Sequence, residues 1–412
     1  MKTERTDEQS VLPRRRYRIA MVAACPFPAD HGTPGCIREM SVYLAELGHE
    51  IFLLTYPTGD ETIPIGKIKV LRVKGKNSVE SIKVGPTAEK PWLNIKLMYL
   101  LLKTIHKEKI DLIHAHNYEG ALIGIVGKFF TGKPLVYHAI NTMRDELPSY
   151  GFIKPQFLAV GLARLLDKFV PRFPDHIAAL TGELKDTLVN EIKIPDRKVS
   201  IITAGVNLDF FDKPNPGRIR KELGLETKPV VMYTGVLDRF QRIDYLLHAF
   251  KNVLAKVNDA VLVIVHPQFS DPEEHQHLAR ELGVEANVIW AIQEQLDDLK
   301  DFLDAADVCV IPRPETPGFP IKLLNYMGMG KAIVTFRGSA KSLRDGVDGC
   351  VIEDHDVEGF GNAVIDLLQD PERAKRIAKT ARESLEKDYS WSSICRKMET
   401  IYHDMCPAGK NL

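Results

Sequence analysis

The segment from residue 307 to residue 336 constrains the fold of this chain more than any other. A mostly apolar run at 307–311 predicts a buried parallel strand. A turn rich in glycine and proline follows, and a short helix is expected at 321–327 before a second strand at 332–336. Free N–H groups at the start of a helix that follows the carboxyl end of a strand attract anions. The segment therefore predicts an anion-binding site in a parallel α/β sheet.

Lys322 lies in the first turn of that expected helix. A positive charge is unfavourable there, because the helix dipole is positive at its N-terminus. A bound anion would explain a lysine at this position better than helix stability does. A solvated surface lysine is the alternative.

Strands and helices alternate along both halves of the chain. Strands are expected at 17–24, 51–55, 68–73, 111–115, 134–138, 176–180, 229–234, 260–265, 288–291, 308–311 and 332–335. Helices are expected at 92–106, 120–130, 155–170 and 391–405. Short connections between such elements predict doubly wound parallel sheets. A Pro/Gly-rich stretch at 212–217 indicates a linker between two α/β domains.

The composition is typical of a soluble enzyme. The chain has 412 residues, enough for two domains, and Lys+Arg equals Asp+Glu at 55 each, so no nucleic-acid partner is expected. No apolar run has membrane-spanning length, and the polar, basic N-terminus shows no secretory signal. The six cysteines are scattered and are expected to be free thiols. A cytoplasmic location follows as the expectation.

Residues 317–334 resemble the nucleotide-sugar site of retaining glycosyltransferases of the large family 4. The family motif runs Glu-Gly-Phe-Gly and, four positions later, continues with a second Glu followed by Ala-Met. Gly318 and Phe319 match it, whereas Pro317 replaces the first Glu and Asn325 replaces the second. A common subgroup has Lys-Leu-x-Glu-Tyr-Met, which this chain fits from Lys322 with that one change.

The resemblance covers nearly the whole chain. Further fragments resemble family segments in the same order, at 48–51, 111–116, 204–211 and 345–356. It implies the GT-B fold, in which two Rossmann-like doubly wound domains face each other across a cleft. It also implies an acceptor-side domain at 1–208 and a nucleotide-sugar-binding domain at 209–390. The last segment, 391–412, is then a helix that crosses back to the first domain.

The family binds the donor diphosphate with an Arg and a Lys in a Gly-Arg-Leu-x-x-x-Lys-Gly segment. The matching segment of this chain has Val236 and Gln241 at those positions. Arg239 and Arg242 are close enough to substitute, because guanidinium groups suit phosphate oxygens; a surface role is the alternative. Asn325 could still bond to the donor ribose. The donor-binding residues expected from the resemblance are Gly32, Gly35, Gly235, Arg239, Gln241, Arg242, Pro317, Gly318, Phe319, Pro320, Ile321 and Asn325.

His138 closes a predicted strand at its carboxyl end, where α/β sheets place functional groups. It matches a family histidine next to the transferred sugar, and it is predicted to be catalytic together with Lys322. A hydrogen-bonded structural histidine is the alternative. On the acceptor side, Arg38, Asn141 and Arg144 are candidates. No metal is expected, because His114-x-His116 lies at a strand end with too few ligands and Asp354-x-Asp356 is predicted to be a loop.

The sequence is best interpreted as a retaining, metal-independent glycosyltransferase without a cofactor. It would move a sugar from a nucleotide-diphosphate sugar to a glycan, lipid-linked or small-molecule acceptor. One alternative is an epimerase or phosphorylase of similar fold. Another is a catalytically impaired homologue that acts as a binding or scaffold subunit. At most weak peripheral association with the inner face of a membrane is expected, with Lys83, Lys90 and Trp92 as its candidate surface.

Overall fold

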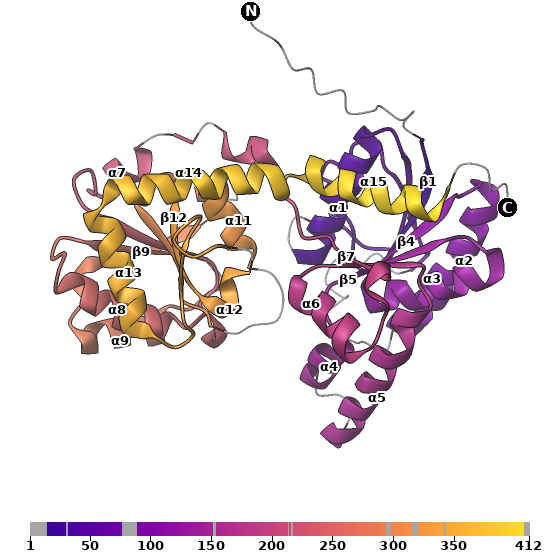
Figure 1. Ribbon diagram of the computed structural model, residues 1–412, viewed down its shortest axis with the longest axis horizontal. Helices are drawn as coiled ribbons and strands as arrows, with labels where there is room; N and C mark the ends of the chain where they lie inside the picture. The colour runs from indigo at the N-terminus through magenta and orange to yellow at the C-terminus, as the bar shows by residue number, and fades with distance from the viewer. Residues whose placement is uncertain are drawn as a thin grey trace, which may run out of the picture. The chain divides into compact units, whose positions relative to one another are not determined.

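The computed structural model describes residues 15–29, 32–75, 89–150, 154–212, 214–215, 217–293, 298–314, 320–341 and 343–407 (Figure 1). The chain divides into two compact units. Unit 1 contains residues 1–202 and 395–412, and unit 2 contains residues 203–394.

Unit 1 is built on a seven-stranded parallel sheet with the order β3-β2-β1-β4-β5-β6-β7. Its strands are β1 (Arg18–Ala23), β2 (Glu50–Thr55), β3 (Lys69–Arg72), β4 (Leu112–His116), β5 (Leu135–Ala139), β6 (His176–Ala179) and β7 (Val199–Ile201). Its helices are α1 (Gly32–Glu46), α2 (Lys90–Lys107), α3 (Asn117–Thr131), α4 (Met143–Glu146), α5 (Gln156–Phe169) and α6 (Gly182–Asp186). The strands are almost wholly apolar because helices cover both faces of the sheet.

The two faces of the unit 1 sheet have different coverings. Side chains of α2, α3 and α5 pack on one face, beside Ile113 and Tyr137. The other face is covered by α1 and by the end of the last helix, α15 (Trp391–Met405). Tyr402 of α15 reaches His114 in β4, and Cys395 contacts the backbone of Met40 in α1. This second face carries the histidines described below.

Unit 2 contains a six-stranded parallel sheet with the order β10-β9-β8-β11-β12-β13. Its strands are β8 (Val230–Thr234), β9 (Val261–Pro267), β10 (Val288–Gln293), β11 (Val308–Ile311), β12 (Ala332–Phe336) and β13 (Cys350–Ile352). Its helices are α7 (Arg218–Glu222), α8 (Ile243–Leu254), α9 (Glu273–Leu282), α10 (Asp298–Ala305), α11 (Ile321–Gly328), α12 (Arg337–Ala340), α13 (Val357–Gln369) and α14 (Pro371–Asp388). Apolar cores lie on both faces of this sheet.

The α/β expectation is confirmed, and most expected elements lie within one to three residues of their predicted limits. The predicted loop at Asp354-x-Asp356 is also confirmed, because Asp356 caps α13 by accepting a hydrogen bond from the Gly359 backbone N–H. The edge strand β7 was not predicted. It is only three residues long and its residues are not uniformly buried, so it lacks the apolar run that marked the other strands. No helix in the described ranges is long and apolar enough to cross a membrane.

Candidate functional site

Helix α11 is attached to the carboxyl end of β8 by one tyrosine. The hydroxyl of Tyr326 accepts a hydrogen bond of 2.9 Å from the Thr234 backbone N–H and lies 3.2 Å from the Thr234 hydroxyl. Lys322 lies one turn earlier on the same face of α11, because residues four apart on a helix are neighbours. The attachment therefore places Lys322 over the turn that follows β8.

Lys322 lies among neutral partners at this turn. Its ammonium donates hydrogen bonds to the hydroxyl of Tyr233 (2.8 Å) and to Oε1 of Gln241 (3.0 Å). It also lies 4.0 Å from the centroid of the Tyr233 ring. The close approach depends on Gly235, where a Cβ would stand 2.8 Å from the Lys322 nitrogen and where φ is +130°. Gln241, at the position of the family lysine, thus orients a lysine from another helix.

Arg313, which the sequence analysis missed, lies beside this lysine just after β11. Its side chain is buried, and its Nε has no hydrogen-bond partner among the described residues. Burial lowers the pKa of Lys322 well below its ordinary value, and the charge of Arg313 lowers it further. Burial likewise lowers the pKa of Arg313. A half-buried lysine beside a buried arginine, neither with a carboxylate partner in the described chain, is costly unless an anion joins them.

The two predicted phosphate-binding arginines differ in their surroundings. Arg242 makes hydrogen bonds of 2.9 and 2.7 Å to the carboxylate of Asp244 and stacks 3.4 Å from the ring centroid of Tyr245. Its charge is therefore already paired. Arg239 is exposed, and both arginines line a cavity of about 550 Å³ that also contains Glu274. Contact of Arg239 or Arg242 with a donor stays a prediction. Arg313, beside Lys322, is the alternative candidate for that contact.

The remaining donor candidates surround the start of α11. Pro320 immediately precedes the helix, Ile321 is its exposed first residue, and Asn325 is half-buried one turn along. Pro317, Gly318 and Phe319 lie outside the described residues.

Unit 1 brings three histidines together at the carboxyl end of its sheet. His116 in β4 is the register partner of His138 in β5, and His114 lies two residues earlier on the same face of β4. The ring centroids of His114 and His116 are 4.3 Å apart, and that of His138 lies 5.4 Å from the second ring. The spacing of two along one strand was visible in the sequence. The pairing of β4 with β5 was not.

The three imidazoles are buried, which favours their neutral form. Burial lowers the pKa of His138 to about 4, although a hydrogen bond with the Ile202 backbone opposes this shift. Burial and the neighbouring rings hold the pKa values of His114 and His116 well below their ordinary value. His114 Nδ1 bonds to the Tyr402 hydroxyl at 2.7 Å. One nitrogen of each ring has no partner among the described residues: Nε2 of His114, Nε2 of His116 and Nδ1 of His138.

These three histidines are a group whose ligand atoms could hold a metal, since those atoms lie within 4.8 Å of one another. Zinc bound by nitrogens at about 2.0–2.1 Å would hold them roughly 3.4 Å apart, so the rings would have to move closer. The rings of His114 and His138 are also stacked nearly parallel, at 2°. Stacked rings direct their in-plane lone pairs side by side rather than toward one point. The expectation that no metal is needed stays a prediction.

The predicted acceptor-side arginines already have partners within unit 1. Arg38 donates to the Pro64 carbonyl (3.3 Å) and pairs with Glu39. Arg144 pairs with Glu191 at 2.6 Å. Asn141 is half-buried in the loop after β5. Gly32 begins α1 with φ +59° and Gly35 is buried in the same helix.

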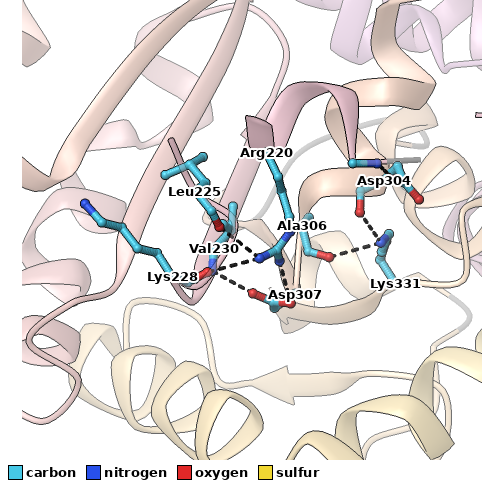
Figure 2. Close-up of polar contacts among 9 residues, drawn as sticks. Arg220, Leu225, Lys228, Val230, Asp304, Ala306, Asp307 and Lys331 are labelled. Atoms are coloured by element: carbon cyan, nitrogen blue, oxygen red, sulfur yellow. Dashed lines mark hydrogen bonds and ion pairs between the residues drawn. The ribbon is translucent and has the colours of Figure 1, made fainter. Parts of the chain in front are cut away.

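A cavity of about 690 Å³ lies at the opposite, amino end of the unit 2 strands. Figure 2 shows that two of its cations, Arg220 and Lys331, bond to neighbouring groups of the protein. Arg220 pairs with Asp307 at 2.7 Å and donates to two backbone carbonyls, and Lys331 donates to two further carbonyls. Hydrogen bonds that link loops to the ends of strands therefore account for the charges of Arg220 and Lys331 in this cavity. No bond to a carboxylate in the described chain accounts for the charges of Lys322 and Arg313 in the same way.

Two family models match the chain. The model of glycosyltransferase family 4 matches residues 32–210, and that of glycosyl transferases group 1 matches residues 228–370. The D-inositol 3-phosphate glycosyltransferase of Thermobispora bispora is 24% identical, over 97% of this chain and 99% of its own. The UDP-Gal:alpha-D-GlcNAc-diphosphoundecaprenol alpha-1,3-galactosyltransferase of Escherichia coli is also 24% identical, over 76% of this chain and 80% of its own.

The fold is shared with solved glycosyltransferases. Sucrose-phosphate synthase from Thermosynechococcus elongatus superposes with a TM-score of 0.75 at 20% identity, covering 95% of this chain and 99% of that one. Together the two family models span most of both sheets. The chain is a member of glycosyltransferase family 4, with the two Rossmann-like domains of the GT-B fold.

Proposed function

We propose that this protein transfers a sugar from a nucleotide-diphosphate sugar bound by unit 2 to an acceptor bound by unit 1. Transfer proceeds with retention of the anomeric configuration and without a metal or other cofactor. The observation that carries the proposal is the pair of half-buried Lys322 and buried Arg313 at the carboxyl edge of the unit 2 sheet. Family membership supports the reaction class, and the name of the E. coli relative gives UDP-galactose as that enzyme's donor.

The pair suits the chemistry of a departing nucleoside diphosphate. Negative charge grows on the leaving group as the sugar bond breaks, and fixed cations and a helix N-terminus lower the energy of that state. The ammonium of Lys322 has three N–H donors, of which Tyr233 and Gln241 take two. The third is available to a phosphate oxygen. Arg313 supplies the second charge that the chain lacks at Val236, where the family has an arginine.

His138 is proposed to act on the sugar rather than on the diphosphate. Its imidazole is neutral at physiological pH, because burial lowers its pKa to about 4. A neutral ring with an unpartnered Nδ1 can accept a hydrogen bond from a sugar hydroxyl. Such a bond would orient the donor sugar while the bond to the diphosphate breaks.

The acceptor is proposed to be a glycan, a lipid-linked sugar or a small molecule, at the cytoplasmic side of a membrane or in the cytoplasm. The names of the relatives include inositol 3-phosphate and a diphosphoundecaprenol-linked sugar as acceptors. Both acceptors are phosphorylated, and only the second is linked to a lipid. The proposal therefore includes both soluble and lipid-linked acceptors.

Thermal-shift measurements with UDP, GDP, ADP and their sugars, in the presence of EDTA, test the donor. A donor at a hundred times its Kd should raise the free energy of unfolding by about 2.7 kcal/mol. The anomer of the product, read by NMR, tests retention. If no nucleotide raises the melting temperature, the proposal fails. If nucleotides bind but no sugar reaches water or any acceptor, the alternative of an impaired binding subunit is favoured.

A further inference from the structure

Helix α5 exposes an apolar face that no described part of the chain covers. The side chains of Ala159, Ala163 and Asp167 face the body of unit 1. The apolar side chains on the outer side are 42–70% exposed: Phe157, Leu158, Leu162, Leu165 and Phe169, followed by Phe173 (53%) just beyond the helix. Figure 1 shows α5, in magenta, extending away from the unit 1 sheet. A run of this length on one face is more than the scattered apolar residues of an ordinary surface.

The exposed charges of the segment that forms this face, residues 154–173, are all positive. Lys154, Arg164, Lys168 and Arg172 are exposed between or beside the apolar side chains. The one acidic residue between 154 and 173 is Asp167, which is buried. Its carboxylate accepts hydrogen bonds from the Tyr118 hydroxyl (3.0 Å) and the Met143 backbone N–H (2.7 Å). Asp167 thus hydrogen-bonds the helix to the body of unit 1, while the exposed charges of α5 itself are both cationic.

We propose that this outer face of α5 binds the surface of an anionic lipid bilayer. An amphipathic helix with Phe and Leu on one face and Lys or Arg at its edges lies in the interface, with the apolar side chains below the headgroups and the cations among them. The charge complementarity distinguishes a lipid surface from a second copy of this chain, whose matching face would carry the same positive charges. The proposal does not depend on the donor assignment.

The sequence analysis had placed the candidate membrane surface on α2 instead. That helix does expose Trp92 and Tyr99. Of the two lysines named with Trp92, Lys83 lies outside the described residues, and Lys90 begins the helix. The ammonium of Lys96, beside Trp92, donates a hydrogen bond to the Lys74 carbonyl. Glu89 and Glu108 at the two ends of α2 reduce its positive charge. The structure therefore favours α5.

Co-sedimentation of the full chain with lipid vesicles tests the proposal. The wild type should bind vesicles of phosphatidylcholine with phosphatidylglycerol and bind pure phosphatidylcholine much less. Phe157→Ser/Leu165→Ser and, separately, Arg164→Glu/Lys168→Glu should each weaken binding to anionic vesicles about tenfold or more. Both pairs are exposed, so circular dichroism should show an unchanged fold. The matched control is Trp92→Ser/Tyr99→Ser on α2, which should bind like the wild type.

Three results would overturn the assignment. The first is a wild type that binds neither kind of vesicle. The second is loss of binding in the α2 variant with binding retained in both α5 variants. The third is self-association of the wild type, measured by light scattering, that Phe157→Ser/Leu165→Ser abolishes while vesicle binding persists; this would assign the face to a second copy of the chain.

Discussion

The ammonium of Lys322 donates a 2.8 Å hydrogen bond to the hydroxyl of Tyr233, which in turn donates to the Val236 carbonyl at 2.7 Å. The tyrosine is thereby oriented to accept from the lysine but cannot neutralise it, because burial raises the pKa of Tyr233 well above its ordinary value. Burial and the nearby charge of Arg313 lower the pKa of Lys322 well below its ordinary value, so a positive charge on this lysine is disfavoured while no anion is bound. A residue held at a cost to stability is expected where a ligand needs it.

Replacement of Lys322 by methionine should separate stability from binding. The free energy of unfolding of the ligand-free protein should rise by about 1 kcal/mol, because a poorly solvated charge is removed. Binding of the nucleoside diphosphate should weaken by roughly 1–3 kcal/mol, the range for a charge-assisted hydrogen bond. Lys331→Met, at the other end of the unit 2 sheet, is the control and should destabilise the protein without affecting binding. Unchanged nucleotide affinity of Lys322→Met by calorimetry would contradict the assignment.

The two arginines near the donor site should respond differently to substitution. Arg313→Gln should weaken nucleotide binding by about 1–3 kcal/mol, since its buried guanidinium has no carboxylate partner in the described chain. Arg242→Gln should change binding little, because Asp244 already pairs with that guanidinium. Calorimetric titration with UDP or the nucleotide identified by thermal shift measures both. The reverse order of effects would restore Arg242 as the phosphate ligand.

Alanine at Gly235 should disturb the lysine without removing it. The new Cβ would stand 2.8 Å from the Lys322 nitrogen, and φ of +130° is a conformation that alanine rarely adopts. Nucleotide binding should fall about tenfold as Lys322 is displaced. Gly283→Ala is matched in having a positive φ, +72°, but nothing lies within 4 Å of its Cβ. Equal losses of affinity in the two variants would show that backbone strain, and not displacement of Lys322, is responsible.

His138→Ala should reduce turnover and leave nucleotide affinity nearly intact. The expected loss falls on the transition state, because the histidine is proposed to orient the sugar and not the diphosphate. Steady-state kinetics and calorimetry on the same preparation measure the two effects. A variant that unfolds at a clearly lower temperature yet keeps its specific activity when folded would show that the histidine is structural.

The three buried histidines should make the protein less stable in mild acid. The pKa of His138 falls from its ordinary 6.5 to about 4 in the folded chain. Between these values the unfolded chain binds a proton that the native chain does not, so stability is lost as the pH falls below about 6.5. His138→Asn should reduce the slope of stability against pH by up to about 1.4 kcal/mol per pH unit. Urea unfolding from pH 7.5 to pH 5 measures it, with exposed His248→Asn as the control. An unchanged slope would show that His138 is not buried as a neutral ring.

Local sequence patterns predicted most strands and the helices around them. Parallel strands buried on both faces must be continuous apolar runs, and such runs are visible without any tertiary information. The position of Lys322 at the start of a helix was visible for the same reason. The three-residue strand β7 escaped because it is short and its residues are not uniformly buried, so it has no apolar run.

The sequence by itself determined the two α/β halves, the family resemblance and the helix that carries Lys322. Only the tertiary structure decided which charges lack partners. Arg242 is neutralised locally by Asp244, two residues along the chain, whereas it is burial after β11, visible only in the fold, that isolates Arg313. Likewise, His116 became a neighbour of His138 only through the pairing of β4 with β5. Pairing and burial depend on contacts between residues far apart in the chain, which periodicity does not encode.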